Sequence, residues 1–426
     1  MRRLLAVLLL TTVRLHAGSP SVVGKWSEKI TWPNVGVHVI LLPDGRLLSI
    51  DRNEDGPPPH HGTRAFVGGP EMKNPTPLQV CEFNIFCAGH AFLPDGTVLL
   101  AGGHTDSNEG IKTTFLFDAR FTTFKRQANM NKGRWYPTVI TLRNGDLLVL
   151  GGTDEHKGIN EVPQVWETKT KKWRNLTARV KFESFSESYY YPMLFIAPKG
   201  SVFMAGPGQH TFFINTEGDG SVKQGSNTLG GDRQAGSAVQ YEPGKIALIG
   251  GGWEPKNLTE TIDLNEKDPV WKKGVPMKNA RRQMNATLLA DGTVLATGGT
   301  SRGSKENWND ATGAVYEAEL WKPGFEGGKW TTMAPMREAR LYHSTAILLP
   351  DARVLVAGGG QPPGNGRAPG NDKADENHET AQIFSPPYLF EGDHDATRPV
   401  IKKAPESVKF GESFVVKTDD AASISR

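Results

Sequence analysis

The sequence predicts an all-β fold built from repeated units, and three features support this. One pattern, two apolar runs separated by a turn, recurs seven times along the 426 residues. Gly and Pro are abundant, at 48 and 29 residues, which favours a fold with many turns. Aromatic residues make up 9% of the chain, including 10 Trp, as expected for a packed interior. Repeats of this kind decide the architecture before any single motif does.

Each repeat has the features of a β-hairpin. An Asp-Gly, Asn-Gly or similar pair supplies the positive φ that a two-residue primed turn requires. The apolar run after it predicts a buried strand, and the Gly-Gly that ends most copies lets two backbones approach closely. The copies span residues 41–50, 92–103, 142–152, 197–206, 242–252, 289–299 and 349–360.

The spacing of the repeats indicates the number and type of blades. Successive turns lie about fifty residues apart, a period typical of the kelch form of the β-propeller. Weaker segments between the copies carry Trp173, Trp271 and Trp330, which predict outer strands whose Trp packs between neighbouring blades. We therefore predict a seven-bladed kelch-type β-propeller over residues 24–384.

The two ends of the propeller are expected to share one blade. Residues 380–384 predict the third strand of the seventh blade, and residues 24–32 predict its fourth strand. Joining them removes an open sheet edge. Residues 385–397 then form a linker. Residues 398–426 alternate like strands but are too few to bury a core, so they predict the start of an incomplete immunoglobulin-like β-sandwich domain.

Charge and targeting signals limit the class of protein. Lys plus Arg number 49 against 46 Asp plus Glu, a net charge of +3 without charged blocks, which argues against nucleic-acid binding. Residues 1–17 have the pattern of a signal peptide, and no later stretch is long and apolar enough for a membrane span. A secreted monomer is expected, and the glycosylation sequons at Asn175, Asn257 and Asn285 fit that route.

Aligning the repeats on their turns brings reactive side chains into one register. Equivalent positions of the innermost strands converge on the axis of a propeller. We therefore expect Cys87 and Tyr136, from adjacent blades, to meet at one mouth of the channel, with His343 in the same ring and Tyr342 beside it. The positions eight residues before each turn are Gly36, Cys87, Tyr136, Tyr191, Ala235, Gln283 and His343.

A thiol, two phenols and an imidazole around one axis suggest a transition-metal site. Imidazole suits copper, and phenolate oxygen can complete a tetragonal Cu(II) set. A thiol linked to a phenol ring would stabilise a tyrosyl radical. Three alternatives remain open: ordinary channel-lining residues, a disulfide between Cys81 and Cys87, and a secreted propeller that binds a partner without chemistry. A carbohydrate hydrolase is disfavoured because the ring positions hold no carboxylate pair.

Several motifs at these positions resemble one known family, the copper radical oxidases of the glyoxal oxidase and galactose oxidase type. They are residues 84–90 (NIFCAGH), 134–137 (RWYP) and 340–344 (RLYHS), together with 385–389 (SPPYL) in the linker. The resemblance covers essentially the whole mature chain. The RWYP form favours the glyoxal oxidase-like branch. The short distance between the predicted signal peptide and the start of the propeller favours the same branch.

The resemblance implies a role for each residue. Tyr136 would be an equatorial copper ligand and radical carrier, crosslinked through its ring to Cys87. Tyr342 would be the axial ligand and the base, His343 an equatorial ligand, and Trp135 an aromatic wall beside the radical, with blade packing as its alternative. The implied cofactors are one copper ion and the Tyr136–Cys87 thioether. The implied reaction oxidises a small aldehyde or primary alcohol and reduces O2 to H2O2.

One ligand of the family pattern has no match. The resemblance implies a second copper imidazole from the C-terminal domain, but the last histidine is His394, in the linker. We therefore expect weaker copper binding, incomplete thioether formation and an impaired oxidase. His90 lies three residues from Cys87 on one strand, and the alternation of side chains turns it to the opposite face.

Overall fold

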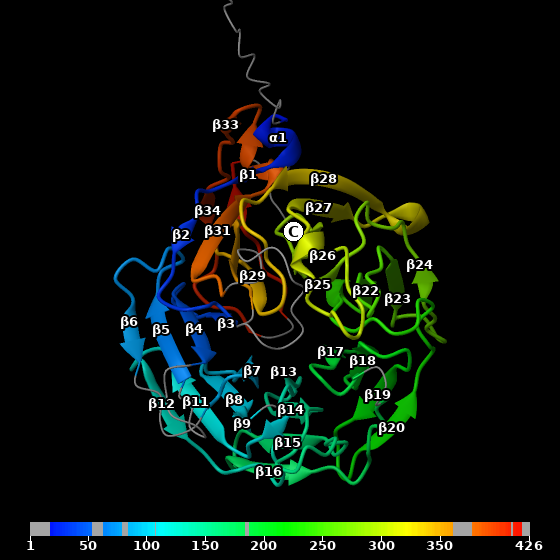
Figure 1. Ribbon diagram of the computed structural model, residues 1–426. Coiled ribbons are helices and arrows are strands. Elements are labelled where there is room, and N and C mark those ends of the chain that lie inside the picture. Colours follow the sequence, from blue (N-terminus) through cyan, green and yellow to red (C-terminus); the bar gives the residue numbers. More distant parts are fainter. Residues whose placement is uncertain are drawn as a thin grey trace, which may run out of the picture.

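The structure, a computed structural model, describes residues 18–52, 63–78, 84–106, 108–183, 187–360, 377–409 and 412–419. It confirms the predicted seven-bladed propeller: antiparallel sheets stand around a central axis, as Figure 1 shows. Helical segments are short, namely α1 (Pro20–Val23), η2 (Ala311–Gly313), η3 (Phe325–Gly327) and η4 (Pro387–Leu389).

Within a blade, the innermost strand comes first and the others follow outward. The first three blades are β3 (His38–Leu41), β4 (Leu47–Arg52), β5 (Thr63–Gly68) and β6 (Thr76–Leu78); β7 (Ala88–Phe92), β8 (Val98–Gly102), β11 (Thr114–Asp118) and β12 (Thr123–Arg126); and β13 (Thr138–Thr141), β14 (Leu147–Leu150), β15 (Gln164–Glu167) and β16 (Lys172–Asn175). A small hairpin, β9 (His104–Asp106) and β10 (Glu109–Gly110), interrupts the second blade.

The next three blades follow the same order. They are β17 (Met193–Ile196), β18 (Val202–Gly206), β19 (Phe212–Asn215) and β20 (Ser221–Gln224); β21 (Ser237–Glu242), β22 (Lys245–Ile249), β23 (Thr259–Asp263) and β24 (Lys272–Lys273); and β25 (Arg282–Leu288), β26 (Val294–Thr300), β27 (Glu317–Lys322) and β28 (Lys329–Pro335).

The seventh blade closes the ring with both ends of the propeller. It contains β29 (Ser344–Leu348), β30 (Val354–Gly358) and β31 (Thr380–Ser385). The early strands β1 (Lys25–Trp26) and β2 (Ile30–Thr31) both pair antiparallel with β31. The ring of Trp26 packs on Phe384, with centroids 4.9 Å apart. This pairing confirms the predicted closure.

The turn between the first two strands of a blade differs from the prediction. In the first blade, Leu42 N–H donates to Arg46 C=O at 2.8 Å, so three residues separate the paired ends. Only Gly45 among them has a positive φ, +83°. This is a type I turn with a glycine bulge, and the predicted two-residue primed turn is wrong. The Asp44 carboxylate accepts Arg46 N–H at 3.0 Å, which favours this geometry.

The hydrophobic core lies between neighbouring blades. Ile50 of the first blade, for example, packs with Val98 and Phe115 of the second, and all three are fully buried. Trp173 donates from its indole to Thr114 of the neighbouring blade at 3.0 Å, which confirms the packing predicted for the Trp-bearing outer strands. Each blade is therefore stabilised by the blade beside it.

Buried arginines hold the Gly-Gly ends of the second strands. Arg134 Nη1 donates to Gly151 C=O at 2.8 Å, and Arg281 Nη1 donates to Gly298 C=O at 2.9 Å. Both arginines are fully buried. A Cβ added at Gly151 would stand 2.5 Å from a backbone oxygen of the next blade, so only glycine fits there.

Beyond the propeller, the chain forms two small sheets. These are β32 (Phe390–Glu391) with β33 (His394–Asp395), and β34 (Ile401–Lys403) with β35 (Lys417–Thr418). Their side chains are mostly exposed, and the immunoglobulin-like domain stays a prediction. The predicted signal peptide lies outside the described residues. In the described part of the chain, no helix combines the length and apolarity needed to cross a bilayer.

Candidate active site

Six of the seven predicted ring residues, all except Gly36, share one backbone conformation. The φ angles are +63°, +64°, +44°, +54°, +57° and +64° at Cys87, Tyr136, Tyr191, Ala235, Gln283 and His343. The left-handed region disfavours a residue with a Cβ by roughly 1–2 kcal/mol, so its recurrence marks a shared structural role. Hydrogen bonds connect neighbouring members: Tyr136 N–H donates to Cys87 C=O at 3.0 Å and Tyr191 N–H to Tyr136 C=O at 2.8 Å. The register deduced from the turns is therefore confirmed at these six positions.

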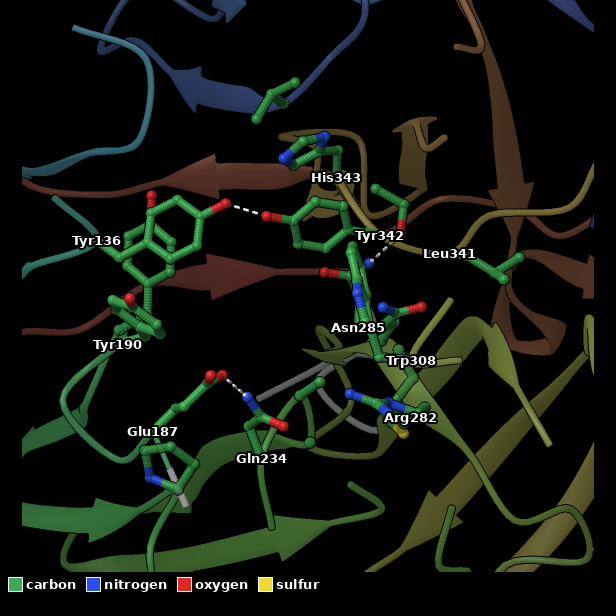
Figure 2. Close-up of a pocket in the computed structure, with 18 of the residues that line it drawn as sticks. Tyr136, Glu187, Tyr190, Gln234, Arg282, Asn285, Trp308, Leu341, Tyr342 and His343 are labelled. Atoms are coloured by element: carbon green, nitrogen blue, oxygen red, sulfur yellow. Dashed lines mark hydrogen bonds between the residues drawn. The ribbon is translucent and has the colours of Figure 1, made fainter. Parts of the chain in front are cut away.

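Two tyrosines from distant blades meet at the axis. The hydroxyls of Tyr136 and Tyr342 form a hydrogen bond, and Figure 2 shows the two side chains pointing toward each other. Tyr136 is only 9% exposed. Burial raises the pKa of Tyr136 well above its ordinary value, and the nearby Cys87 and Tyr342 groups raise it further. Without a bound cation, the Tyr136 phenol therefore remains protonated at neutral pH.

Cys87 and His343 flank this pair. Cys87 is fully buried in one hydrophobic cluster with Phe86 and Tyr136, against which Tyr342 also packs. The His343 ring lies against the Tyr342 ring, with centroids 3.8 Å apart. The four side chains predicted to meet at one mouth are thus brought together. Cys81, the alternative partner of Cys87, lies outside the described residues.

Aromatic rings enclose Tyr136. Trp135 stacks on it, with centroids 4.1 Å apart and planes 14° apart, and Tyr191 stacks at 4.7 Å and 23°. Tyr190 meets the ring edge-on at 5.3 Å. Trp135 also pairs through its backbone with Thr153, so it contributes to blade packing as well as to the wall of the site.

A cavity of about 1020 Å³ opens beside the two phenols. One part of its wall has a regular origin: the residue immediately before each ring position lines the cavity. These residues are Val35, Phe86, Trp135, Tyr190, Gln234, Arg282 and Tyr342. In the aligned repeats, these residues stand one position before the ring positions.

A polar wall lies across the cavity from the phenols (Figure 2). The Gln234 side-chain amide donates to the Glu187 carboxylate. Arg282 is 1% exposed, donates to Trp253 C=O at 3.2 Å, and places its guanidinium 5.0 Å from the Trp253 ring centre. Burial lowers the pKa of Arg282 to about 10, so it stays charged at neutral pH, and burial raises the pKa of Glu187.

The chemistry of the donor set fits copper. Tyr136 and Tyr342 provide two phenol oxygens and His343 provides an imidazole, a mixed N,O set of the kind that Cu(II) accepts. Among the described residues, no group of three or more His, Cys, Asp and Glu side chains is arranged to hold a metal ion, so a metal at the hub would depend on the phenols.

Comparison with known proteins places these features in context. The family model described as the glyoxal oxidase N-terminus matches residues 69–240 and 253–388. "Galactose oxidase" of Gibberella zeae is 28% identical over 430 residues, which cover 94% of this chain and 60% of that protein. "Aldehyde oxidase GLOX" of Vitis pseudoreticulata is 28% identical over 373 residues, 80% of this chain and 67% of that protein.

A solved structure agrees with this. It is titled a novel fungal alcohol oxidase with catalytic diversity among the AA5 family, in complex with copper, and it superposes with a TM-score of 0.80 at 25% identity. The match covers 94% of this chain and 84% of that one.

Proposed function

Because the chain belongs to the glyoxal oxidase N-terminus family, we propose that it is a secreted copper radical oxidase that oxidises small aldehydes or primary alcohols and reduces O2 to H2O2. The chain spans 60% of the galactose oxidase that it matches, so the activity of the whole protein is part of this proposal. The glyoxal oxidase-like branch is favoured by residues 134–137 and by the family match.

The observation that carries the proposal is the hydrogen-bonded pair of Tyr136 and Tyr342 beside His343. These three side chains would hold the copper ion, which when bound supplies a one-electron acceptor next to a phenol that can be oxidised. Tyr342 is suited to be the base, because its hydroxyl oxygen reaches the cavity and can take a proton from a bound substrate.

Tyr136 is suited to carry the radical. The stacked rings of Trp135 and Tyr191 exclude water from its faces, which would protect an oxidised phenol. A thioether to Cys87 would spread the unpaired electron further, and burial of both residues in one cluster supports this crosslink.

We further propose that the donors of this chain alone bind copper more weakly than a set with two imidazoles. Two phenols and one imidazole leave a position of a tetragonal Cu(II) set to solvent or another group. His394 is exposed in the β32–β33 hairpin, and His90 does not line the cavity in the described part of the chain. Weak binding would slow crosslinking and impair the oxidase.

Peroxide release tests the proposal directly. Copper-loaded protein is expected to release H2O2 with glyoxal or methylglyoxal and less with galactose, and its intact mass is expected to fall by two hydrogen atoms. Metal-free protein is the control. If neither peroxide nor the mass loss follows copper loading, the site is a structural feature of a binding protein.

A further inference from the structure

Three backbone hydrogen bonds at the hub join equivalent residues of neighbouring blades among the described residues, and Cys87 is additionally held by a side chain. Tyr136 and Tyr191 each donate their N–H to the carbonyl of the equivalent residue in the preceding blade, and the fifth and sixth blades are joined in the same way. Cys87 N–H donates to a side chain, Nε2 of His38, at 3.0 Å. This bond therefore holds the backbone of the residue whose thiol is proposed to form the crosslink.

The surroundings of His38 favour a neutral imidazole that accepts a hydrogen bond at Nε2. It lies on β3 and is 8% exposed, with its ring edge-on to His90 at 5.5 Å and to Phe86 at 6.4 Å between centroids. Accepting at Nε2 requires the neutral imidazole with its proton on Nδ1. Burial, followed by the charges of His90 and His343, holds the pKa of His38 well below its ordinary value, which agrees with that form.

Both peptide groups of Cys87 are therefore held. His38 fixes the N–H, and Tyr136 N–H fixes the C=O, while the residue sits at a φ of +63° that its Cβ disfavours. With these two bonds in place, the backbone of Cys87 sets the direction in which its thiol points. A buried N–H without an acceptor is unfavourable enough to promote a rearranged backbone.

We infer that His38 is a positioning residue for the Cys87 thiol, and that it aligns the sulfur with the Tyr136 ring for crosslinking. This rests on the proposed function. In the crosslinking step a bond forms between Cys87 Sγ and a ring carbon of Tyr136, and the S–H and C–H bonds break. The two electrons and two protons released reduce O2 to H2O2.

A pair of variants of similar shape tests this role. His38→Gln keeps an oxygen acceptor, whereas His38→Met has only a thioether, a weak acceptor. The readout is the fraction of intact protein that has lost two hydrogen atoms, followed over time after adding Cu(II) in air. We expect His38→Met to crosslink about tenfold more slowly, equivalent to about 1.4 kcal/mol of misalignment, and His38→Gln to stay close to wild type.

The control is His90→Met, which removes an imidazole from the same cluster without touching the Cys87 N–H. The positioning role is overturned if His38→Met crosslinks at the wild-type rate, or if His90→Met slows crosslinking equally. Should His38→Met not fold, His38→Asn, with a shorter reach, replaces it under the same expectation. If wild-type protein forms no crosslink, the proposed function fails first and this role with it.

Discussion

Tyr342 and His343 show how adjacent residues acquire different tasks at the hub. The left-handed backbone at His343 changes the chain direction there, and the residue before it faces the cavity. Tyr342 therefore reaches Tyr136, while His343 stays against its ring. The same geometry in other blades puts Trp135, Gln234 or Arg282 on the cavity wall.

Removing the Tyr342 hydroxyl is expected to stop turnover without unfolding the protein. We expect Tyr342→Phe to lower the peroxide-release rate of the copper-loaded enzyme by about 100-fold or more, because a general base contributes on this scale. The matched control is Tyr316→Phe, which removes a hydroxyl from a half-exposed tyrosine outside the site. Equal rates in Tyr342→Phe and wild type would exclude Tyr342 as the base.

The sequence predicted the ring residues, but of the cavity wall it indicated only Trp135 and Tyr342, through the family resemblance. Turn spacing located Cys87, Tyr136 and His343, because hairpin length is fixed within a repeat. Turn spacing did not reveal the left-handed φ at these positions, so it gave no sign that the preceding side chain of every blade turns inward. His38 was missed for a different reason: its bond to Cys87 joins two blades and leaves no local pattern.

At the scale of elements, the seventh blade depends on a carboxylate between β28 and β31. Burial alone would raise the pKa of Glu338, but bonds from His378 and Thr380 and the charge of Arg340 outweigh it and lower the pKa to about 2. This depressed pKa stabilises the fold at pH values above the ordinary value of 4.5, and the contribution is lost as pH falls from 4.5 toward 2.

Glu338→Gln is therefore expected to make the stability of the fold depend less on pH in the acid range. The wild-type melting temperature should fall more steeply than that of Glu338→Gln between about pH 5 and about pH 2.5. Calorimetry at a series of pH values measures this. An exposed carboxylate, Glu217→Gln, is the control and should leave the slope unchanged. Parallel curves for Glu338→Gln and wild type would exclude this source of acid sensitivity.

The closing strand offers a second test at this scale. Trp26 packs on Phe384, and its indole donates to Ala334 C=O at 2.8 Å, so it connects β1 to both β31 and the end of β28. Trp26→Ala is expected to lower the free energy of unfolding by about 3 kcal/mol, measured by urea denaturation. Phe325→Ala, at a side chain 93% exposed, should change it by less than about 0.5 kcal/mol.

Element prediction succeeded where one residue type dictates the geometry. The glycines of the Gly-Gly ends and the strand pattern of residues 24–32 placed the blades and their closure. The turn type was mispredicted because Asp-Gly serves both two- and three-residue hairpins, and the choice depends on the Asp44 side-chain bond.

For the molecule as a whole, copper is expected to act as a stabilising ligand. A metal that binds only the folded state adds about 1.4 kcal/mol at a free concentration ten times its dissociation constant. We expect Cu(II) to raise the melting temperature of the wild type, and to raise that of His343→Ala by a smaller amount. Addition of a chelator is the control and should restore the metal-free value. Equal shifts in both proteins would mean that the metal binds elsewhere.

The shared seventh blade also determines at which stage of synthesis the proposed site can form. Tyr342 and His343 lie just before β29. The sheet that contains β29 is incomplete until β31 is made and pairs with the earliest strand, β1. In the proposed oxidase, a growing chain that has made Cys87 and Tyr136 must therefore wait until β31 has been made before the four side chains of the site can assemble.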